Sequence, residues 1–331
     1  MDRGDLMLAR QTAETFRREA RDPAYAPSLA RACVCLGMAI LTQGDPAGAR
    51  AHLEEALEIY DPGWNREAKL RFGSDVGALA TAYLAKASWL LGDVAQARKL
   101  MDQTVARAIQ LQHAPTRAFI GSRTAQLEAL RGNAEAMLSA SETMVELSQD
   151  YGLKLFLAWG KTYRGWAIAR LGDREAGVRE LREGLAGVAA QGSKQHVPLY
   201  LALLAEIEAE MGESALSRID GALALARETG EHWSDSFLHR IRGEILLKLD
   251  PTNTAAAEQA FRSAIAIAQA QKARSFELQA ALGLARFYQS TARLAEAHAV
   301  LVPVLEGFSP TPEMPEIAEA QALLERLAHG G

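Results

Sequence analysis

Apolar residues recur at steps of three and four along most of the chain. After Asp45 they occupy Ala49, Leu53 and Ala56, and residues 97–108 repeat the same spacing. A period of about 3.6 residues places such side chains on one face of an amphipathic α-helix. No segment alternates apolar and polar residues between hairpin turns, as half-buried strands do. The pattern therefore predicts an all-α fold.

The breaks between these segments predict the ends of sixteen helices, to within about two to four residues. The expected helices span residues 5–20, 28–43, 46–60, 74–91, 94–112, 115–131, 134–150, 153–171, 174–190, 197–211, 214–229, 232–248, 254–271, 274–290, 293–307 and 313–328.

A short sequence motif recurs between the expected helices. Gly92, Gly132, Gly172 and Gly212 are spaced 40 residues apart, and an Asp, Asn or Glu follows each of them. Such a glycine takes the left-handed conformation that ends a helix, and the Asp or Asn after it caps the next helix. Asp93 also precedes a glutamine at the spacing of a capping box. Related phrases stand at Gly4-Asp5, at Gly44-Asp45-Pro46 and, with the glycine lost, at Asp250-Pro251.

Small residues recur where the two helices of each pair are expected to touch. The segment 36–56 also follows the pattern of tetratricopeptide repeats position by position. The repeat of this chain is 40 residues long, whereas the usual tetratricopeptide repeat has about 34. A length of 40 also occurs in other repeats built from helix pairs. The small residues favour the tetratricopeptide type, and they are Gly37, Ala85, Ala125, Gly165, Ala205, Gly243 and Gly283.

The sequence thus predicts a right-handed superhelical solenoid of about seven tetratricopeptide-like helix pairs. We expect an N-terminal half repeat in residues 1–27, the repeat array in 28–307, and a C-terminal capping helix with a tail in 308–331. The segment 61–64 lengthens one connection. Because the first helix of the first pair is missing, we expect the chain to be part, or a descendant, of a larger protein.

The net charge and the length of the apolar runs argue against nucleic-acid and membrane partners. The net charge is -5, and no basic stripe of the kind that neutralises phosphates is visible. We therefore predict no direct nucleic-acid partner. The apolar runs are too short to span a membrane, and the first ten residues are not a signal peptide. No membrane partner and a cytoplasmic location are expected.

The two cysteines do not suggest a metal site or a disulfide. Cys33 and Cys35 are two residues apart on a predicted helix, so their side chains point about 200° apart. We interpret them as small buried residues in a reducing compartment.

Motifs of common catalytic and cofactor sites are missing. Residues 187–194 approach a phosphate-binding loop, but the serine precedes the lysine and no strand leads into it. The seven histidines lack zinc-site spacing, and no nucleophile motif is present. We predict no catalytic residue, no metal ligand and no cofactor, and expect that the protein is not an enzyme.

Several short sequence segments resemble the C-terminal tetratricopeptide region of large bacterial signalling proteins. They are residues 59–62, 157–160, 164–167, 239–247, 276–281 and 295–298. Those proteins join a class III adenylate/guanylate cyclase domain, or a DNA-binding domain, to a regulatory P-loop ATPase. The resemblance covers residues 5–328 and implies a non-catalytic region that senses a ligand or partner. It carries over no catalytic residue, because the family's catalytic motifs lie elsewhere.

In tetratricopeptide arrays the first helix of each pair lines the concave side. Large and polar side chains projected onto that side form a candidate groove for a partner. Two alternatives stay open: Trp159, Trp166 and Phe237 pack as core between repeats, and Arg240 simply pairs with Glu244. The candidate residues are Leu79, Lys86, Trp89, Phe119, Gln126, Trp159, Thr162, Trp166, Glu206, Phe237, Arg240, Glu244 and Phe287.

The favoured function is a non-catalytic scaffold for protein interaction or ligand sensing, acting as the regulatory region of a signalling ATPase–cyclase or transcriptional regulator. Its expected partner is a protein or peptide, including an ATPase, cyclase or DNA-binding domain in cis or in trans. The alternatives are a free-standing adaptor for a peptide segment, an RNA-binding helical repeat, and an enzyme with a pocket in the solenoid.

Overall fold

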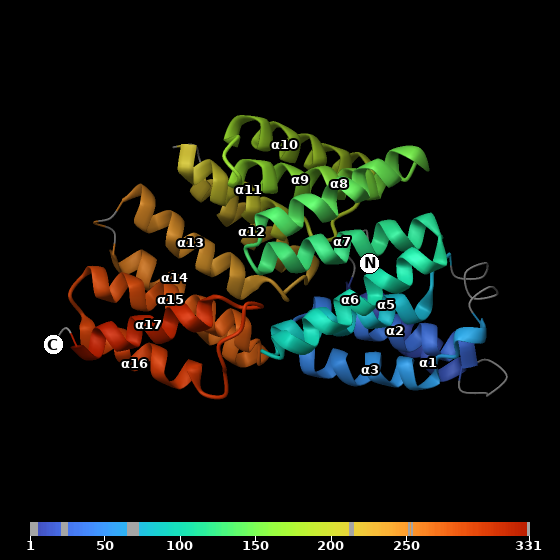
Figure 1. The fold of residues 1–331 in the computed structure, drawn as a ribbon, viewed down its shortest axis with the longest axis horizontal. Coiled ribbons are helices and arrows are strands. Elements are labelled where there is room, and N and C mark those ends of the chain that lie inside the picture. Colours follow the sequence, from blue (N-terminus) through green and yellow to red (C-terminus); the bar gives the residue numbers. More distant parts are fainter. Residues whose placement is uncertain are drawn as a thin grey trace.

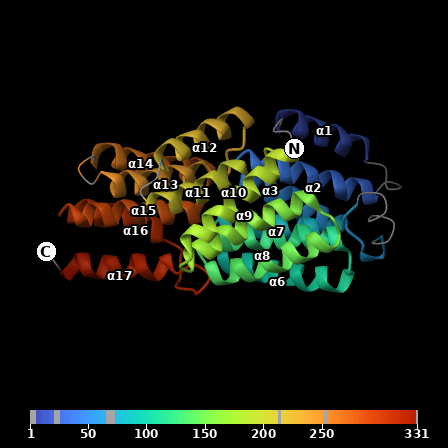
Figure 2. The ribbon, with the colours of Figure 1, turned by 90° about the horizontal axis from the view of Figure 1, so that it is seen from above.

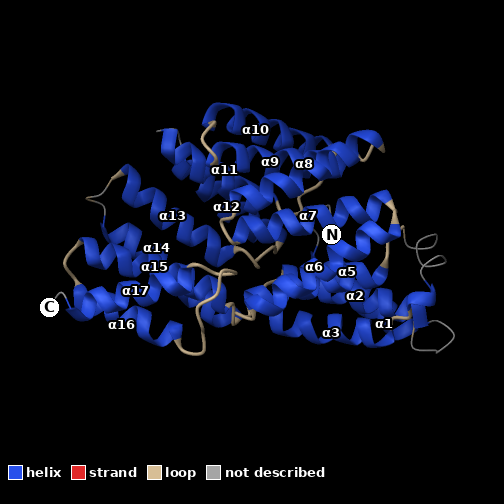
Figure 3. Ribbon diagram, in the orientation of Figure 1, coloured by secondary structure: helices blue, strands red, loops and turns tan. Residues whose placement is uncertain are grey.

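The computed structural model describes residues 6–20, 26–64, 73–211, 215–250, 252 and 254–329. Within these ranges every regular element is helical (Figure 3). The elements are α1 (Leu6–Glu19), α2 (Ala26–Thr42), α3 (Pro46–Ile59), the short 3-10 helix η2 (Pro62–Trp64), α5 (Val76–Leu90), α6 (Val94–Leu111), α7 (Ala114–Leu130), α8 (Ala134–Asp150), α9 (Lys154–Arg170), α10 (Arg174–Ala190), α11 (Val197–Met211), α12 (Ala215–Thr229), α13 (Asp235–Leu249), α14 (Thr254–Gln271), α15 (Arg274–Ser290), α16 (Leu294–Leu305) and α17 (Glu316–His329).

The helix prediction is confirmed for all sixteen expected helices, whose ends lie within three residues of the predicted ones. Seven of the described helix pairs follow one another from α2/α3 to α15/α16, with α1 packed on α2 and α17 packed on α15 and α16. The chain is therefore the all-helical repeat solenoid that the sequence predicts.

The turns between paired helices have the predicted chemistry at most positions. Gly92 has a φ of 91°, a conformation that favours glycine, and Gly44, Gly132 and Gly172 are also left-handed. The carboxylate of Asp45 accepts a hydrogen bond from the Gly48 N–H at 2.8 Å, as a helix N-cap does. The phrases at Gly4-Asp5, Gly212 and Pro251 lie outside the described residues.

The predicted capping box at Asp93 is wrong. Its side chain makes no capping hydrogen bond to α6. Its Oδ2 instead lies 3.4 Å from Arg50 Nη2 of the preceding pair. The local spacing could not reveal this cation, because it comes from a residue 43 positions away.

Small residues allow the paired helices to approach closely. A Cβ on Gly165 would lie 2.5 Å from the Leu181 nitrogen, and one on Gly37 would lie 2.8 Å from Leu53 Cγ. Gly283 differs from the prediction, because a Cβ there would meet Phe261 of α14 at 2.8 Å rather than its own partner α16. The absence of a side chain at Gly283 therefore makes room for Phe261 at the contact between two successive helix pairs.

The superhelix closes on itself. Figure 1 shows the chain rising from the blue helices α1 to α3, arching over through α7 to α12, and returning until the late helices meet the end of α5. The turned view in Figure 2 shows α13 to α17 continuing toward the C-terminus at the end of the molecule away from α1. Contacts between α5 and α15 join the early repeats to the late ones.

We call these early-to-late contacts the seam. At the seam, backbone carbonyls at the C-terminal ends of three early helices accept hydrogen bonds from late repeats. The last carbonyls of a helix lack partners within the helix and are free to accept such bonds. Thr42 O accepts the His232 N–H at 3.0 Å, Trp89 O accepts the Ser275 hydroxyl, and Leu130 O accepts from Gln279 Nε2 at 3.0 Å. The late repeats thus satisfy the ends of α2, α5 and α7.

Candidate functional site on the inner face

The thirteen candidate groove residues all lie on α5, α7, α9, α11, α13 or α15, the first helices of their pairs. Few of them are accessible, because most pack against neighbouring helices. Phe119, Glu206, Arg240 and Glu244 are half-buried. The other nine are buried: Leu79, Lys86, Trp89, Gln126, Trp159, Thr162, Trp166, Phe237 and Phe287.

A pocket of about 160 Å³ lies where the first helices converge, and we call it the central pocket. Five of the candidate residues line it: Trp166, Glu206, Phe237, Arg240 and Glu244. Its other lining residues include Arg170 of α9, Gln279 and Arg286 of α15, and Glu316 of α17.

Glu206 is a carboxylate of the pocket that contacts both an indole and a guanidinium group. Trp166 Nε1 donates a hydrogen bond to its Oε2 at 2.8 Å, and Arg170 Nη1 lies 3.9 Å from its Oε1. Burial raises the pKa of Glu206, while the charge of Arg170 opposes that rise. The indole therefore orients one oxygen atom of a carboxylate that faces other polar groups.

Arg240 is the inner cation of the pocket. It pairs with Glu244 at 2.5 Å, and its guanidinium lies 4.9 Å from the centre of the Phe237 ring. Burial lowers the pKa of Arg240, but the carboxylates of Glu244 and Glu206 outweigh it and the net pKa is raised. Its Nε has no hydrogen-bond partner among the described residues. One donor of a charged group is thus free to bind an acceptor.

Gln279 links the pocket to the seam. Its Nε2 donates to Leu130 O at 3.0 Å and to Glu316 Oε1 at 2.7 Å. Gln279 Oε1 and Glu316 Oε2 have no hydrogen-bond partner in the described part of the chain. A group bound in the pocket would therefore contact the same amide that holds α15 to α7.

The sequence prediction missed four polar residues of the pocket. Gln279 and Arg286 lie on α15, where the projection named only Phe287, and Arg170 follows Trp166 by one helical turn. Because residues four apart lie on the same face of a helix, the position of Trp166 could have predicted that Arg170 also lines the pocket. Glu316 belongs to α17, which lies outside the repeat pattern and so gave no signal.

Three of the other candidates, Lys86, Gln126 and Trp159, belong to a separate buried cluster. Arg123 Nη1 lies 2.7 Å from His196 Nε2, and His196 Nδ1 lies 3.2 Å from Glu231 Oε1. Lys86 Nζ sits 3.1 Å from the centre of the Trp233 ring, and Arg123 Cζ lies 5.7 Å from the centre of the Trp159 ring. The cluster also includes Tyr163 and Tyr200, whose rings are 5.3 Å apart.

The last candidates pack within or between helix pairs. The hydroxyl of Thr162 donates to Ala158 O, and its side chain lies against Gly184 in α10. Leu79 packs with Val34 and Ala56 of the first pair. These positions show why a projection from sequence alone mixes inner-face residues with core residues.

The chemistry available to the inner face is recognition by charge and hydrogen bonds. In the described ranges no group of three or more His, Cys, Asp or Glu is arranged to hold a metal ion. None of the described helices is both long and apolar enough to cross a membrane. The central pocket presents guanidinium groups and carboxylates together, which suits a small polar ligand with both donors and acceptors.

A second hollow lies on the outer side, between α6, α7 and α8, with a volume of about 590 Å³. Most of its lining is apolar, and Ile109, one of the lining residues, is 61% exposed. Arg98, Asp102 and Arg117 also line it. No sequence argument pointed to this surface, because the projection considered only the concave side.

Comparison with known proteins adds little to this geometry. The sequence matches no protein-family model, and no curated protein matches it. Among solved structures, yeast Tom70 is 15% identical over 98% of this chain and 59% of its own, with a TM-score of 0.46. A Signal Transduction ATPase with Numerous Domains (STAND) protein with a tetratricopeptide repeat sensor, from Pyrococcus horikoshii, is 12% identical over 97% of this chain and 49% of its own, with a TM-score of 0.49.

A circular tandem repeat protein is 15% identical over 98% of this chain and 90% of its own, with a TM-score of 0.22. This chain thus spans 59% of the Tom70 chain and 49% of the STAND chain. These low scores carry no argument about function.

Proposed function

We propose that this chain is a non-catalytic sensing scaffold, in which a small polar ligand bound in the central pocket controls how firmly the early and late repeats are held together. The observation that carries the proposal is Gln279, which lines the central pocket and also donates to Leu130 O across the seam. A ligand that contacts Gln279 would change the free energy of the seam by its difference in affinity for the closed and opened superhelix.

The output of such a scaffold would be carried by an attached or associated domain. Segments such as residues 239–247 and 276–281 resemble bacterial cyclase–ATPase and regulator–ATPase proteins, which suggests a regulatory ATPase joined to a cyclase or DNA-binding domain as that output. Opening and closing of the seam would then change the position of the chain ends relative to the ATPase.

The pocket favours a ligand over a peptide as the first partner. A volume of about 160 Å³ is well below the 300–1,000 Å³ typical of sites for drug-sized molecules. Among the described residues, nine of the thirteen candidates are buried, so the inner face offers an extended peptide little open surface in this conformation. A protein partner would therefore bind elsewhere, or after the superhelix opens.

The test is a screen of small polar metabolites by native mass spectrometry, with hydrogen exchange as the structural readout. We expect a ligand that adds its mass to the wild type and protects the amides of residues 232–233 and 274–279. Arg240→Met should abolish binding, because the free Nε and the positive charge disappear. Arg242→Met is the matched control, since Arg242 lies two residues along α13 and pairs with Asp220 of α12.

Two outcomes would contradict the proposal. Binding that survives in Arg240→Met would place the ligand outside the central pocket. Conversion of a bound metabolite into a product of different mass would show that the chain is an enzyme.

A further inference from the structure

The hollow on the outer side, between α6, α7 and α8, shares no lining residue with the central pocket, and we call it the outer hollow. Its volume of about 590 Å³ lies within the range of about 300–1,000 Å³ that is typical of small-molecule sites. The outer hollow is therefore large enough to hold a whole small molecule.

The outer hollow is elongated along its helices. Its lining runs from Arg98 to Ile109 on α6 and from Arg117 to Glu128 on α7, and each row spans about 16 Å at about 1.5 Å per residue. An ion pair of 2.7 Å between Arg98 and Glu128 joins the start of α6 to the end of α7. The two helices are therefore antiparallel, and Ile109 and Arg117 lie toward the other end of the hollow.

The stretch between these two ends is apolar. The hydroxyls of Thr124 and Thr143 donate to carbonyl oxygens of their own helices, Ile120 O at 3.0 Å and Ser139 O at 3.1 Å. An apolar chain bound there would leave water without displacing any of these hydrogen bonds. The apolar and small lining residues are Met101, Val105, Ala106, Ala108, Ile109, Ile120, Gly121, Ala136, Ala140, Met144 and Leu147.

The charges of the lining are paired except at one end. Arg98 Nε lies 3.2 Å from Asp102 Oδ1, and the two oxygens of Glu128 contact Arg98 at 2.7 Å and Arg131 at 2.6 Å. Arg117 is half-buried, and its side chain forms no ion pair or hydrogen bond with the described residues. One guanidinium at the end of an apolar hollow is thus available to an anion.

We propose that the outer hollow binds an elongated apolar monocarboxylic acid, with its chain along α6 and α8 and its carboxylate on Arg117. A guanidinium binds a carboxylate through two parallel hydrogen bonds, and the single cation matches a ligand with a single charge. Met101 and Met144 have flexible, polarisable side chains that adapt to an alkyl chain. The site is independent of the proposed function, since it uses neither the central pocket nor the seam.

Isothermal titration calorimetry of the full chain tests the site with sodium octanoate, 1-octanol and octylammonium chloride. We expect octanoate to bind about 10-fold more tightly than octanol, because only the carboxylate pairs with the guanidinium, and octylammonium to bind most weakly. Each methylene added between hexanoate and octanoate should tighten binding about 3-fold to 4-fold, as burial of that group predicts.

Variants of the cation test the recognition of the carboxylate. Arg117→Met should weaken octanoate binding about 10-fold and leave octanol binding unchanged. Arg117→Lys keeps the charge but loses the paired hydrogen bonds, so its affinity should lie between those of the wild type and Arg117→Met. Lys99→Met is the control, since Lys99 is an exposed cation of α6 that does not line the hollow.

A larger side chain in the hollow tests its location. Ala106→Phe should abolish binding of both octanoate and octanol, because Ala106 lines the hollow and is exposed enough for the ring to replace the ligand without disturbing the core. Ala186→Phe is the matched control, since Ala186 holds the equivalent exposed position of α10, two 40-residue repeats later. Arg240→Met should bind octanoate like the wild type, which separates this site from the central pocket.

The inference is overturned if the wild type does not bind octanoate, or if octanol binds as tightly as octanoate. Unchanged octanoate affinity in Arg117→Met or in Ala106→Phe would overturn it as well. A dimer of the wild type that Ala106→Phe separates into monomers, without any binding of octanoate, would assign the outer hollow to a second copy of the chain instead.

Discussion

At Gly165 the backbones of α9 and α10 approach so closely that a side chain has no room. A Cβ there would lie 2.5 Å from the Leu181 nitrogen and 2.6 Å from the Gly177 carbonyl oxygen. Both are backbone atoms, so the two helices would have to move apart. We expect Gly165→Ala to lower the free energy of unfolding by about 1–3 kcal/mol, the cost of overpacking a core.

Gly221→Ala in α12 is the control for this prediction. A Cβ at that position would meet no atom within 4 Å. Since alanine loses less backbone entropy than glycine in a helix, this variant should gain about 0.5–1 kcal/mol. Urea denaturation of both variants measures the difference, and a Gly165→Ala protein as stable as the wild type would contradict the prediction.

His196 supplies a second prediction at the scale of one residue. Burial, assisted by the Arg123 charge, lowers the pKa of His196 to about 4 from its usual 6.5. Between those values the unfolded chain takes up a proton that folded His196 does not, so stability falls as the pH drops from about 6.5 to about 4. At about 1.4 kcal/mol per pKa unit the loss is on the order of 3 kcal/mol.

His196→Asn should remove this part of the pH dependence. Asparagine suits the position because residue 196 has a φ of 62°, which asparagine tolerates better than most residues. The measurement is the difference in unfolding free energy between variant and wild type from pH 4 to pH 7. A difference that does not change with pH would show that folded His196 takes up its proton at the same pH as in the unfolded chain. His298→Gln, at an exposed site, is the control.

The helices themselves were the most predictable elements. Their ends depend on local signals, namely the turn glycines, the caps and the apolar spacing, and the structure confirms all sixteen within three residues. Asp93 does not form a capping box, and its carboxylate lies near an arginine of the preceding pair instead. Local patterns therefore predict helices well, and fail where a polar side chain has a partner in another element.

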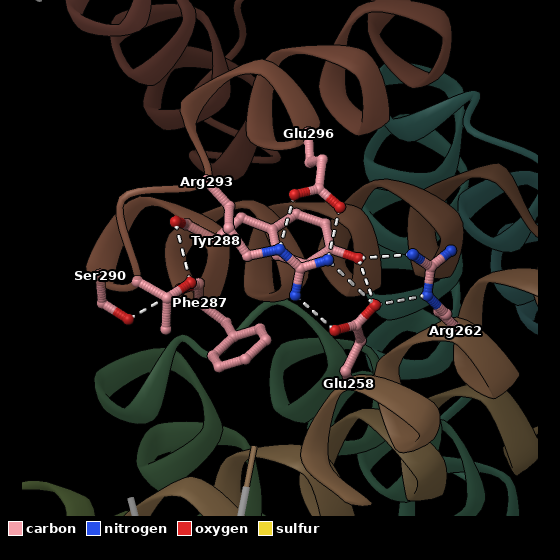
Figure 4. Close-up of polar contacts among 8 residues, drawn as sticks. Glu258, Arg262, Phe287, Tyr288, Ser290, Arg293 and Glu296 are labelled. Atoms are coloured by element: carbon pink, nitrogen blue, oxygen red, sulfur yellow. Dashed lines mark hydrogen bonds and ion pairs between the residues drawn. The ribbon is translucent and has the colours of Figure 1, made fainter. Parts of the chain in front are cut away.

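The last two helix pairs are joined by an ion cluster around Glu258 (Figure 4). Glu258 of α14 accepts hydrogen bonds from Arg293 Nη1 at 2.6 Å, from the Tyr288 hydroxyl at 2.8 Å and from Arg262 Nε at 2.9 Å. Arg293 also binds Glu296 in the first turn of α16. Side chains from three consecutive helices thus form one hydrogen-bonded cluster around Glu258.

We predict that Glu258→Gln loosens this junction in a pH-dependent way. The hydrogen bonds from Arg293 chiefly lower the pKa of Glu258 to about 2 from its usual 4.5. The stabilisation is complete above about pH 4.5 and is lost as the pH falls toward 2. The wild type should therefore exceed the variant in stability at pH 7, with a gap that closes between pH 4.5 and 2.

Acid titration of thermal unfolding measures that gap. Glu54→Gln is the comparison variant, since Glu54 pairs with Arg50 on its own helix α3. An equal loss in both variants at pH 7 would contradict a special role for the Glu258 cluster.

At the scale of the whole molecule, the seam joins the early repeats to the late ones. The sequence predicted the repeat array and five of the pocket residues, but not that the array closes. Gln279 and Leu130 are 149 residues apart in sequence, and a periodic sequence pattern cannot predict a contact between such distant positions. The place of Glu316 of α17 in the pocket follows from this closure and could not be predicted for the same reason.

Gln279→Leu should weaken the seam. It removes the donor to Leu130 O and to Glu316, and an unsatisfied buried acceptor costs about 1–3 kcal/mol. We expect faster hydrogen exchange at residues 274–279 and a larger radius of gyration by small-angle scattering. Gln289→Leu, on an exposed face of the same helix, should change neither. Equal exchange rates in the two variants would show that Gln279 does not hold the early and late repeats together.

The seam also changes how the chain reaches its folded state. In an open solenoid each repeat contacts only its neighbours, so folding can start anywhere and spread along the array. Here the Ser275 hydroxyl binds the carbonyl of Trp89 across 186 positions of sequence. Contacts of such high contact order form late and slow the folding of the whole. The closed array should therefore unfold with greater cooperativity than its repeats alone, and the joining of its early and late repeats should be the last and slowest step of folding.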